Sequence, residues 1–189
     1  MKITILEETP NSIRLRLDGV DYTFANALRR VAINSVKCFA IDSVTFYENS
    51  SAMFDEYIAH RIGLVPILTP KGSKDEDSIL FKLEAEGPAT VYSKDLESTD
   101  RYVRVANEKI PIIKLAEGQR IRLEGKAVLG SASKSAKFQP GLVTYKQLSE
   151  DQFEFYVETF GQMEAKEILN RALENINEGL KVISKHLKK

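Results

Sequence analysis

TFANALRRVAINSVKC, residues 23–38, has the clearest helical pattern in the chain, and the neighbouring segments read as elements packed against it. Small and apolar side chains recur at three- and four-residue spacing, which predicts one apolar helix face. That face consists of Phe24, Ala27, Leu28, Val31, Ala32 and Ser35. Thr23 follows an extended segment, so we expect the helix to begin there with the threonine hydroxyl as its cap.

The segments on either side alternate in polarity as β-strands do. Residues 3–6 and 12–18 predict a hairpin, and residues 40–48, AIDSVTFYE, predict a third strand because they are rich in β-branched and aromatic side chains. A second helix is expected after a cap within residues 49–51, with Gly63 as its C-terminal cap. Its apolar face would consist of Met53, Phe54, Tyr57, Ile58 and Ile62.

The middle of the chain has short strand patterns, and its end has one long helical pattern. After a polar segment at residues 70–78, five strand-like runs follow: ILFKLEAE, ATVYSKDL, RYVRVA, IPIIKL and QRIRLEGKAVL. Residues 141–148 and 153–160 predict two more strands, and residues 164–187 predict a terminal helix roughly 35 Å long. The apolar stripe of that helix must be covered either by the chain's own sheet or by another protein chain.

This order of elements predicts an α+β fold. We expect a discontinuous domain, formed by residues 1–48 and 148–189, around an inserted, mostly β domain at residues 49–147.

Composition restricts the function. The chain has 189 residues with 27 basic and 27 acidic side chains, so its net charge does not favour a stand-alone nucleic-acid binder. Cys38 is the one cysteine and cannot form an internal disulfide. The first residues do not resemble a secretory signal, and no segment has the roughly 20 apolar residues of a membrane span. We therefore expect a soluble, cytoplasmic protein.

Catalytic patterns are weak throughout the sequence. His60, with Glu56 four residues before it, and His186 are the two histidines, and neither belongs to an HExxH pair. Glycine-rich phosphate motifs are absent, and the lysines of residues 131–138 are a weak phosphate signal. The pattern favours a non-catalytic protein that functions by assembly.

Three collinear motifs then provide a specific resemblance. NALRR at residues 26–30, AIDSV at 40–44 and DEYIAHRIGLVPI at 55–67 resemble the RNA polymerase subunits of the α type. These are bacterial α, the third-largest subunit of eukaryotic polymerase II and the archaeal D subunit, and the last is the most similar. VYSKDL, PIIKLAEGQRIRLEGKAVLG, AKFQPG and FEFYVETFG extend the resemblance over essentially the whole chain.

The resemblance implies a non-catalytic assembly platform within the DNA-directed RNA polymerase, which is a nucleotidyltransferase complex that supports transcription. In this family the discontinuous part is a dimerisation domain, an antiparallel sheet with two long helices, that pairs with the smaller L subunit. The implied interface residues are Phe24, Leu28, Val31, Ala32, Ile168, Leu169, Ala172, Leu173, Ile176, Leu180 and Ile183. The implied contacts with the second-largest catalytic subunit are Asn26, Arg29, Arg30, His60, Arg61 and Lys137.

Further expectations follow from the resemblance. The small N and P subunits would be neighbours, DNA would be met only through the complex, and no membrane is involved. No catalytic residue, metal or cofactor is expected, because the chain lacks the cysteines of the iron–sulfur domain found in some relatives.

Two other functions stay open. One is a self-contained homodimeric binding protein that uses the same helices, and the other is a small-molecule enzyme that uses His60 and Glu56.

Overall fold

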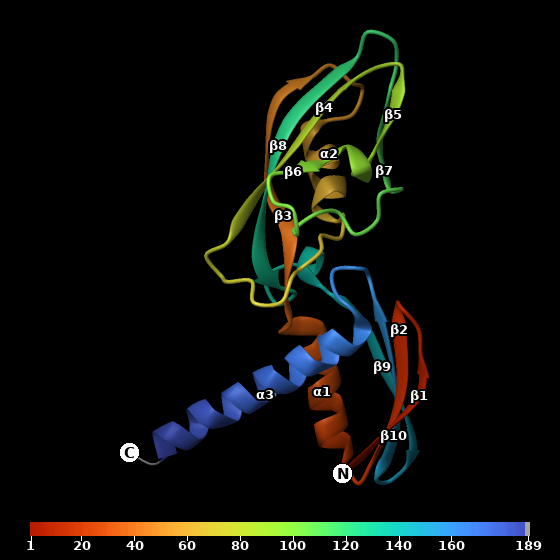
Figure 1. Ribbon diagram of the computed structural model, residues 1–189, viewed down its shortest axis with the longest axis vertical. Coiled ribbons are helices and arrows are strands. Elements are labelled where there is room, and N and C mark those ends of the chain that lie inside the picture. The colour runs from red at the N-terminus through yellow and green to blue at the C-terminus, as the bar shows by residue number, and fades with distance from the viewer. Residues whose placement is uncertain (188–189) are drawn as a thin grey trace. The chain divides into compact units, whose positions relative to one another are not determined.

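A computed structural model describes residues 1–187 as two compact units, and Figure 1 shows their secondary structure. The first unit is formed by Met1–Lys37 with Ser131–Lys189, and the second by Cys38–Gly130. No helix among residues 1–187 is long and apolar enough to cross a membrane. The mixed α+β class predicted from the sequence is confirmed.

The first unit is an antiparallel sheet with two helices on one face (Figure 1). The strand order is β1, β2, β10, β9, formed by Lys2–Glu8, Ser12–Asp18, Gln152–Thr159 and Gly141–Ser149. The helices are α1, Tyr22–Asn34, and α3, Ala165–Leu187, and a short 3-10 helix, Ala136–Phe138, precedes β9.

Register places the core of this unit on one face of the sheet. Leu17, Leu15 and Ile13 of β2 lie opposite Phe153, Phe155 and Val157 of β10, and all six are buried. Directly opposed residues share a face of the sheet, so these side chains form one apolar surface. The helices cover it with Ala25, Leu28 and Ala32 from α1 and Ile168, Leu169 and Ala172 from α3.

The second unit is mostly β. Its main sheet has the order β3, β8, β4, β6, formed by Lys37–Asn49, Arg120–Ser131, Ser78–Glu86 and Glu97–Ser98. β5, Ala89–Tyr92, pairs with β7, Pro111–Leu115, and the helices are α2, Asp55–Gly63, and the 3-10 helix Ser93–Asp95. Phe39, Phe81, Ile58 and Ile62 are among the fully buried side chains of its core.

The unit boundaries differ from the domain boundaries expected from the sequence. β3 belongs to the second unit because it pairs with β8, and residues 131–147 belong to the first because β9 pairs with β10. β3 and β8 are distant in sequence, and the β9–β10 hairpin joins the first unit through the pairing of β10 with β2. Strand patterns alone do not reveal such partners.

Three local predictions were wrong. α1 begins at Tyr22, and its cap is Asp21, not Thr23 as predicted. The Asp21 carboxylate accepts a 2.8 Å hydrogen bond from the amide of Phe24. Residues 101–106 are not a strand; within them Val105 forms an isolated bridge with Ile67.

The third error concerns α2, which starts after Phe54 without a side-chain cap and ends with Gly63 as its last helical residue. The side-chain amide of Asn49 instead donates to the carbonyl of Met53, at 2.9 Å, and to the carboxylate of Asp55, at 2.7 Å. Asn49 therefore closes the loop before the helix.

Candidate assembly surfaces

The terminal helix is fixed to the end of α1 by polar side chains. Asn175 of α3 donates from Nδ2 to the carbonyl of Ser35, at 3.0 Å, and Arg171 donates to the carbonyl of Lys37, at 3.4 Å. Arg171 also bonds Glu167 one turn earlier, at 2.9 Å. Because the last carbonyls of a helix have no partner within it, the bond from Asn175 to the C-cap Ser35 stabilises the C-terminus of α1. Arg171 bonds the first residue of β3, and the two donors together help to set the position of α3.

The eleven residues predicted for the interface with the L subunit divide between the core and the surface. Leu28, Ala32, Ile168, Leu169 and Ala172 are buried within the first unit, and Phe24, Val31 and Ile176 are partly buried. Leu173 is 36% exposed, Leu180 60% and Ile183 58%. The buried residues already complete the chain's own core, so the surface available to a partner is the stripe of Leu173, Leu180 and Ile183.

The end of α3 is exposed throughout. All residues from Asn177 to Leu187 are exposed, whereas the first part of the helix buries Ala165, Ile168, Leu169 and Ala172. Figure 1 shows this second half of the helix continuing past α1 and the sheet of its own unit. An amphipathic helix with an unburied stripe is typical of an interface.

The residues predicted for the second-largest catalytic subunit lie in both units. Asn26, Arg29 and Arg30 lie on α1, where Arg29 donates to the amide oxygen of Asn26 at 3.0 Å. Lys137 follows the start of the 3-10 helix, with its ammonium 5.6 Å from the ring centre of Phe138.

The second unit contributes His60 and Arg61, which are both exposed on α2. Arg61 donates to the carbonyls of Ile112, at 2.8 Å, and Pro111, at 2.5 Å, so β7 fixes its guanidinium.

The sequence interpretation missed a hollow beside α2. Phe54 and Tyr57 were expected on the buried face, but they are 71% and 64% exposed. They line an open hollow of about 640 Å³, which we call the α2 groove. Its lining consists of Ala52, Met53, Phe54, Tyr57, His60, Arg61, Ile113 and Lys114. The four-residue spacing of Ile58 and Ile62 alone would have indicated the buried face correctly.

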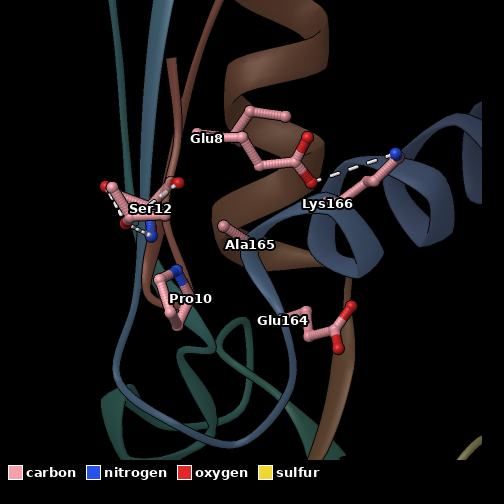
Figure 2. Close-up of a pocket in the computed structure, with 8 residues that line it drawn as sticks. Glu8, Pro10, Ser12, Glu164, Ala165 and Lys166 are labelled. Carbon is pink, nitrogen blue, oxygen red and sulfur yellow. Dashed lines mark hydrogen bonds and ion pairs between the residues drawn. The ribbon is translucent and has the colours of Figure 1, made fainter.

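A second hollow, of about 400 Å³, lies where the β1–β2 turn meets the start of α3 (Figure 2). Glu8 and Lys166 form an ion pair there at 3.9 Å, and Thr9 and Ser12 share a 2.8 Å hydrogen bond within the turn. Figure 2 shows the Glu164 carboxylate apart from this pair. These contacts close the turn against the helix, and we interpret the hollow as structural.

The shifted pKa values arise from surface hydrogen bonds. The carboxylate of Glu124 accepts from Tyr47 at 2.8 Å and raises the pKa of that phenol, and Glu158 does the same to the pKa of Tyr156 at 3.1 Å. Backbone amides of Val103 and Tyr102 lower the pKa of Asp100.

The described residues were also compared with the ligand sets that metal ions require. Within residues 1–187 no three His, Cys, Asp or Glu side chains cluster as metal ligands, and the Cys38 thiol is buried.

Comparison with known proteins identifies the family. The model of the RNA polymerase Rpb3/RpoA insert domain matches residues 31–144. DNA-directed RNA polymerase subunit Rpo3 of Methanocaldococcus jannaschii is 52% identical over 151 residues, which cover 80% of this chain and 78% of that protein. The chain belongs to the archaeal Rpo3 family. Rpo3 is the archaeal α-type protein that the motifs resemble, so the sequence-based assignment is confirmed.

Other Rpo3 proteins are similar over a smaller share of their own length. The Thermococcus kodakarensis protein is 48% identical over 156 residues, covering 79% of this chain and 60% of that protein. The Pyrococcus furiosus protein is 48% identical over 153 residues, covering 77% of this chain and 59% of that protein. The match thus spans less than two thirds of these two Rpo3 proteins.

Proposed function

We propose that this chain is a non-catalytic assembly platform of the archaeal DNA-directed RNA polymerase. It pairs with the L subunit through α3 and then docks the second-largest catalytic subunit and the small N and P subunits. The observation that supports this most directly is the exposed stripe of Leu173, Leu180 and Ile183 on a helix whose first half already completes its own core.

Burial of the stripe would contribute to the stability of a pair. Burying an exposed Leu or Ile side chain fully contributes about 1.5–3 kcal/mol, so the stripe, widened by Ile176 and Leu187, gives a gross gain on the order of 10 kcal/mol before the costs of association. The same stripe exposed to water promotes aggregation of the isolated chain.

The basic side chains of α1 and α2 suit a second contact. Arginine presents a planar fork of donors that binds a carboxylate or carbonyl in two-point geometry. Arg30 is exposed, and Arg29 and Arg61 are already oriented by Asn26 and by the carbonyls of β7. We expect these arginines, with His60 and Lys137, to fix the second-largest subunit.

Co-expression with the L subunit from the same genome tests the pairing. We expect a one-to-one heterodimer by light scattering, and the double variant Leu180→Glu/Ile183→Glu should abolish it because two carboxylates cannot be buried unpaired. Val182→Glu is the matched control, since Val182 is 56% exposed on the same helix but off the stripe.

The homodimer alternative predicts a different result in the same co-expression experiment. A stable homodimer of this chain that ignores the L subunit would favour the self-contained binding protein and contradict the platform.

A further inference from the structure

A glycine, Gly179, lies in the exposed half of α3. Its backbone is helical and its φ is not positive, so the position does not require glycine for its conformation. A methyl group at its Cα would meet no atom of the described residues within 4 Å outside its own turn of helix. Glycine is among the least favourable residues in a helix and alanine is the most favourable. Gly179 therefore weakens α3 without a packing reason inside the chain.

Gly179 lies on the side of α3 that faces α1 earlier in the helix. Arg171 and Asn175 bond backbone carbonyls at and just beyond the C-terminus of α1, and Ala172 between them is fully buried. Ala172 thus marks the place where α3 passes α1 (Figure 1). Seven residues make almost two helical turns, so Gly179 points in nearly the same direction as Ala172.

The distance between these two positions matches the spacing of packed helices. At 1.5 Å per residue Gly179 lies roughly 10 Å beyond Ala172 along α3, and the axes of packed helices are about 8–10 Å apart. A helix of another chain that lay beside α1 would therefore cross α3 at Gly179. Ile176 and Ile183, about one turn before and after, would pack on either side of that crossing.

We propose that Gly179 is the point at which a helix of the L subunit crosses α3 with its backbone close to the Gly179 Cα. The missing side chain lets the two backbones approach, and the exposed Leu180 and Ile183 then pack against the same helix. The identity of the partner rests on the proposed function, whereas the position of the crossing rests on Gly179 itself. Gly179 is a positioning residue, which weakens α3 alone and sets how closely the partner packs.

The experiment measures the dissociation constant of the heterodimer, by titration of fluorescently labelled L subunit with the full chain. We expect Gly179→Ala to weaken pairing roughly five-fold or more, and Gly179→Leu to weaken it further, because added side-chain atoms overpack a close contact. A merely structural role in the helix predicts the opposite sign, since alanine and leucine are better helix formers than glycine. Circular dichroism of each purified heterodimer should show no loss of helix.

Glu178→Ala and Glu178→Leu are the matched controls. Glu178 is exposed and lies on the opposite side of the helix from Leu180 and Ile183. Both control variants should pair with the L subunit as the unmodified chain does.

The other outcomes overturn the inference and separate it from the proposed function. Unchanged or tighter pairing of Gly179→Ala rejects the close crossing, and the proposed pairing survives if Leu180→Glu/Ile183→Glu still abolishes it. Equal weakening by the Glu178 variants also rejects a contact specific to Gly179. If the Gly179 variants change only self-association, a second copy and not the L subunit crosses α3. If the unmodified chain does not pair with the L subunit, both the inference and the proposed pairing fall.

Discussion

The side-chain amide of Asn175 donates a 3.0 Å hydrogen bond to the carbonyl of Ser35, the C-cap of α1. The bond joins residues 140 positions apart in sequence. It lies at the point where α3 changes from buried to exposed, because Ala172 is fully buried and every residue from Asn177 to Leu187 is exposed. Asn175 therefore helps to fix the direction in which the exposed stripe leaves the first unit.

Replacing Asn175 should destabilise the first unit modestly. Asn175→Ala removes one donor from a helix end, for which we expect a loss of about 0.5–1.5 kcal/mol in the free energy of unfolding. Urea unfolding of the purified heterodimer measures the change. Asn177→Ala on the exposed part of the same helix is the control, and an equal loss in both variants would contradict the role of the bond.

The two faces of β4 should respond differently to the same substitution. Leu83 is 1% exposed in the second unit's core and Leu80 is 41% exposed on the opposite face. Leu83→Ala should cost about 2–5 kcal/mol, because it removes transfer free energy and leaves a cavity. Leu80→Ala should cost about 0.5 kcal/mol. Thermal unfolding of both variants checks the difference, and similar melting temperatures would disagree with the assigned register of β4.

Asp100 should make part of the stability depend on acid pH. Its carboxylate accepts from the amides of Tyr102, at 2.7 Å, and Val103, at 3.0 Å, and these bonds lower its pKa in the folded state. The folded chain therefore binds this proton less readily than the unfolded chain, whose Asp has a pKa of about 3.9. The stabilisation is present above that value and is lost as the pH falls through the folded pKa.

Asp100→Asn removes the titration but keeps an oxygen acceptor for both amides. We expect the free energy of unfolding of this variant to fall less steeply below about pH 4 than that of the unmodified chain. Asp100→Ala loses the acceptor too and should be the less stable variant at neutral pH. An unchanged acid slope in Asp100→Asn would show that the folded and unfolded pKa values are equal.

The heterodimer with the L subunit should contain no stoichiometric metal from this chain. The sole thiol, that of Cys38, is buried, and residues 1–187 offer no cluster of three ligand side chains. Elemental analysis of the purified pair measures the content, with the L subunit alone as the blank. One zinc or several iron atoms per pair above that blank would contradict the prediction.

The amino-acid sequence alone determined the family, most elements and the α+β class. NALRR, AIDSV and DEYIAHRIGLVPI are collinear strings, and the amphipathic spacing of α3 is long enough to define both its ends. Local capping was less predictable, because Asp21 and Thr23 are both good caps and only the backbone path selects between them.

Tertiary structure decided which apolar residues remain exposed. The α3 stripe has the same spacing from Ile168 to Ile183, but the sheet and α1 cover only its first half. Likewise Phe54 and Tyr57 fit a buried stripe by composition, yet the core contacts α2 through Ile58 and Ile62. Periodicity indicates that a helix has an apolar face. Which residues of that face are buried depends on strands that pair across distant parts of the chain, such as β2 with β10 and β3 with β8.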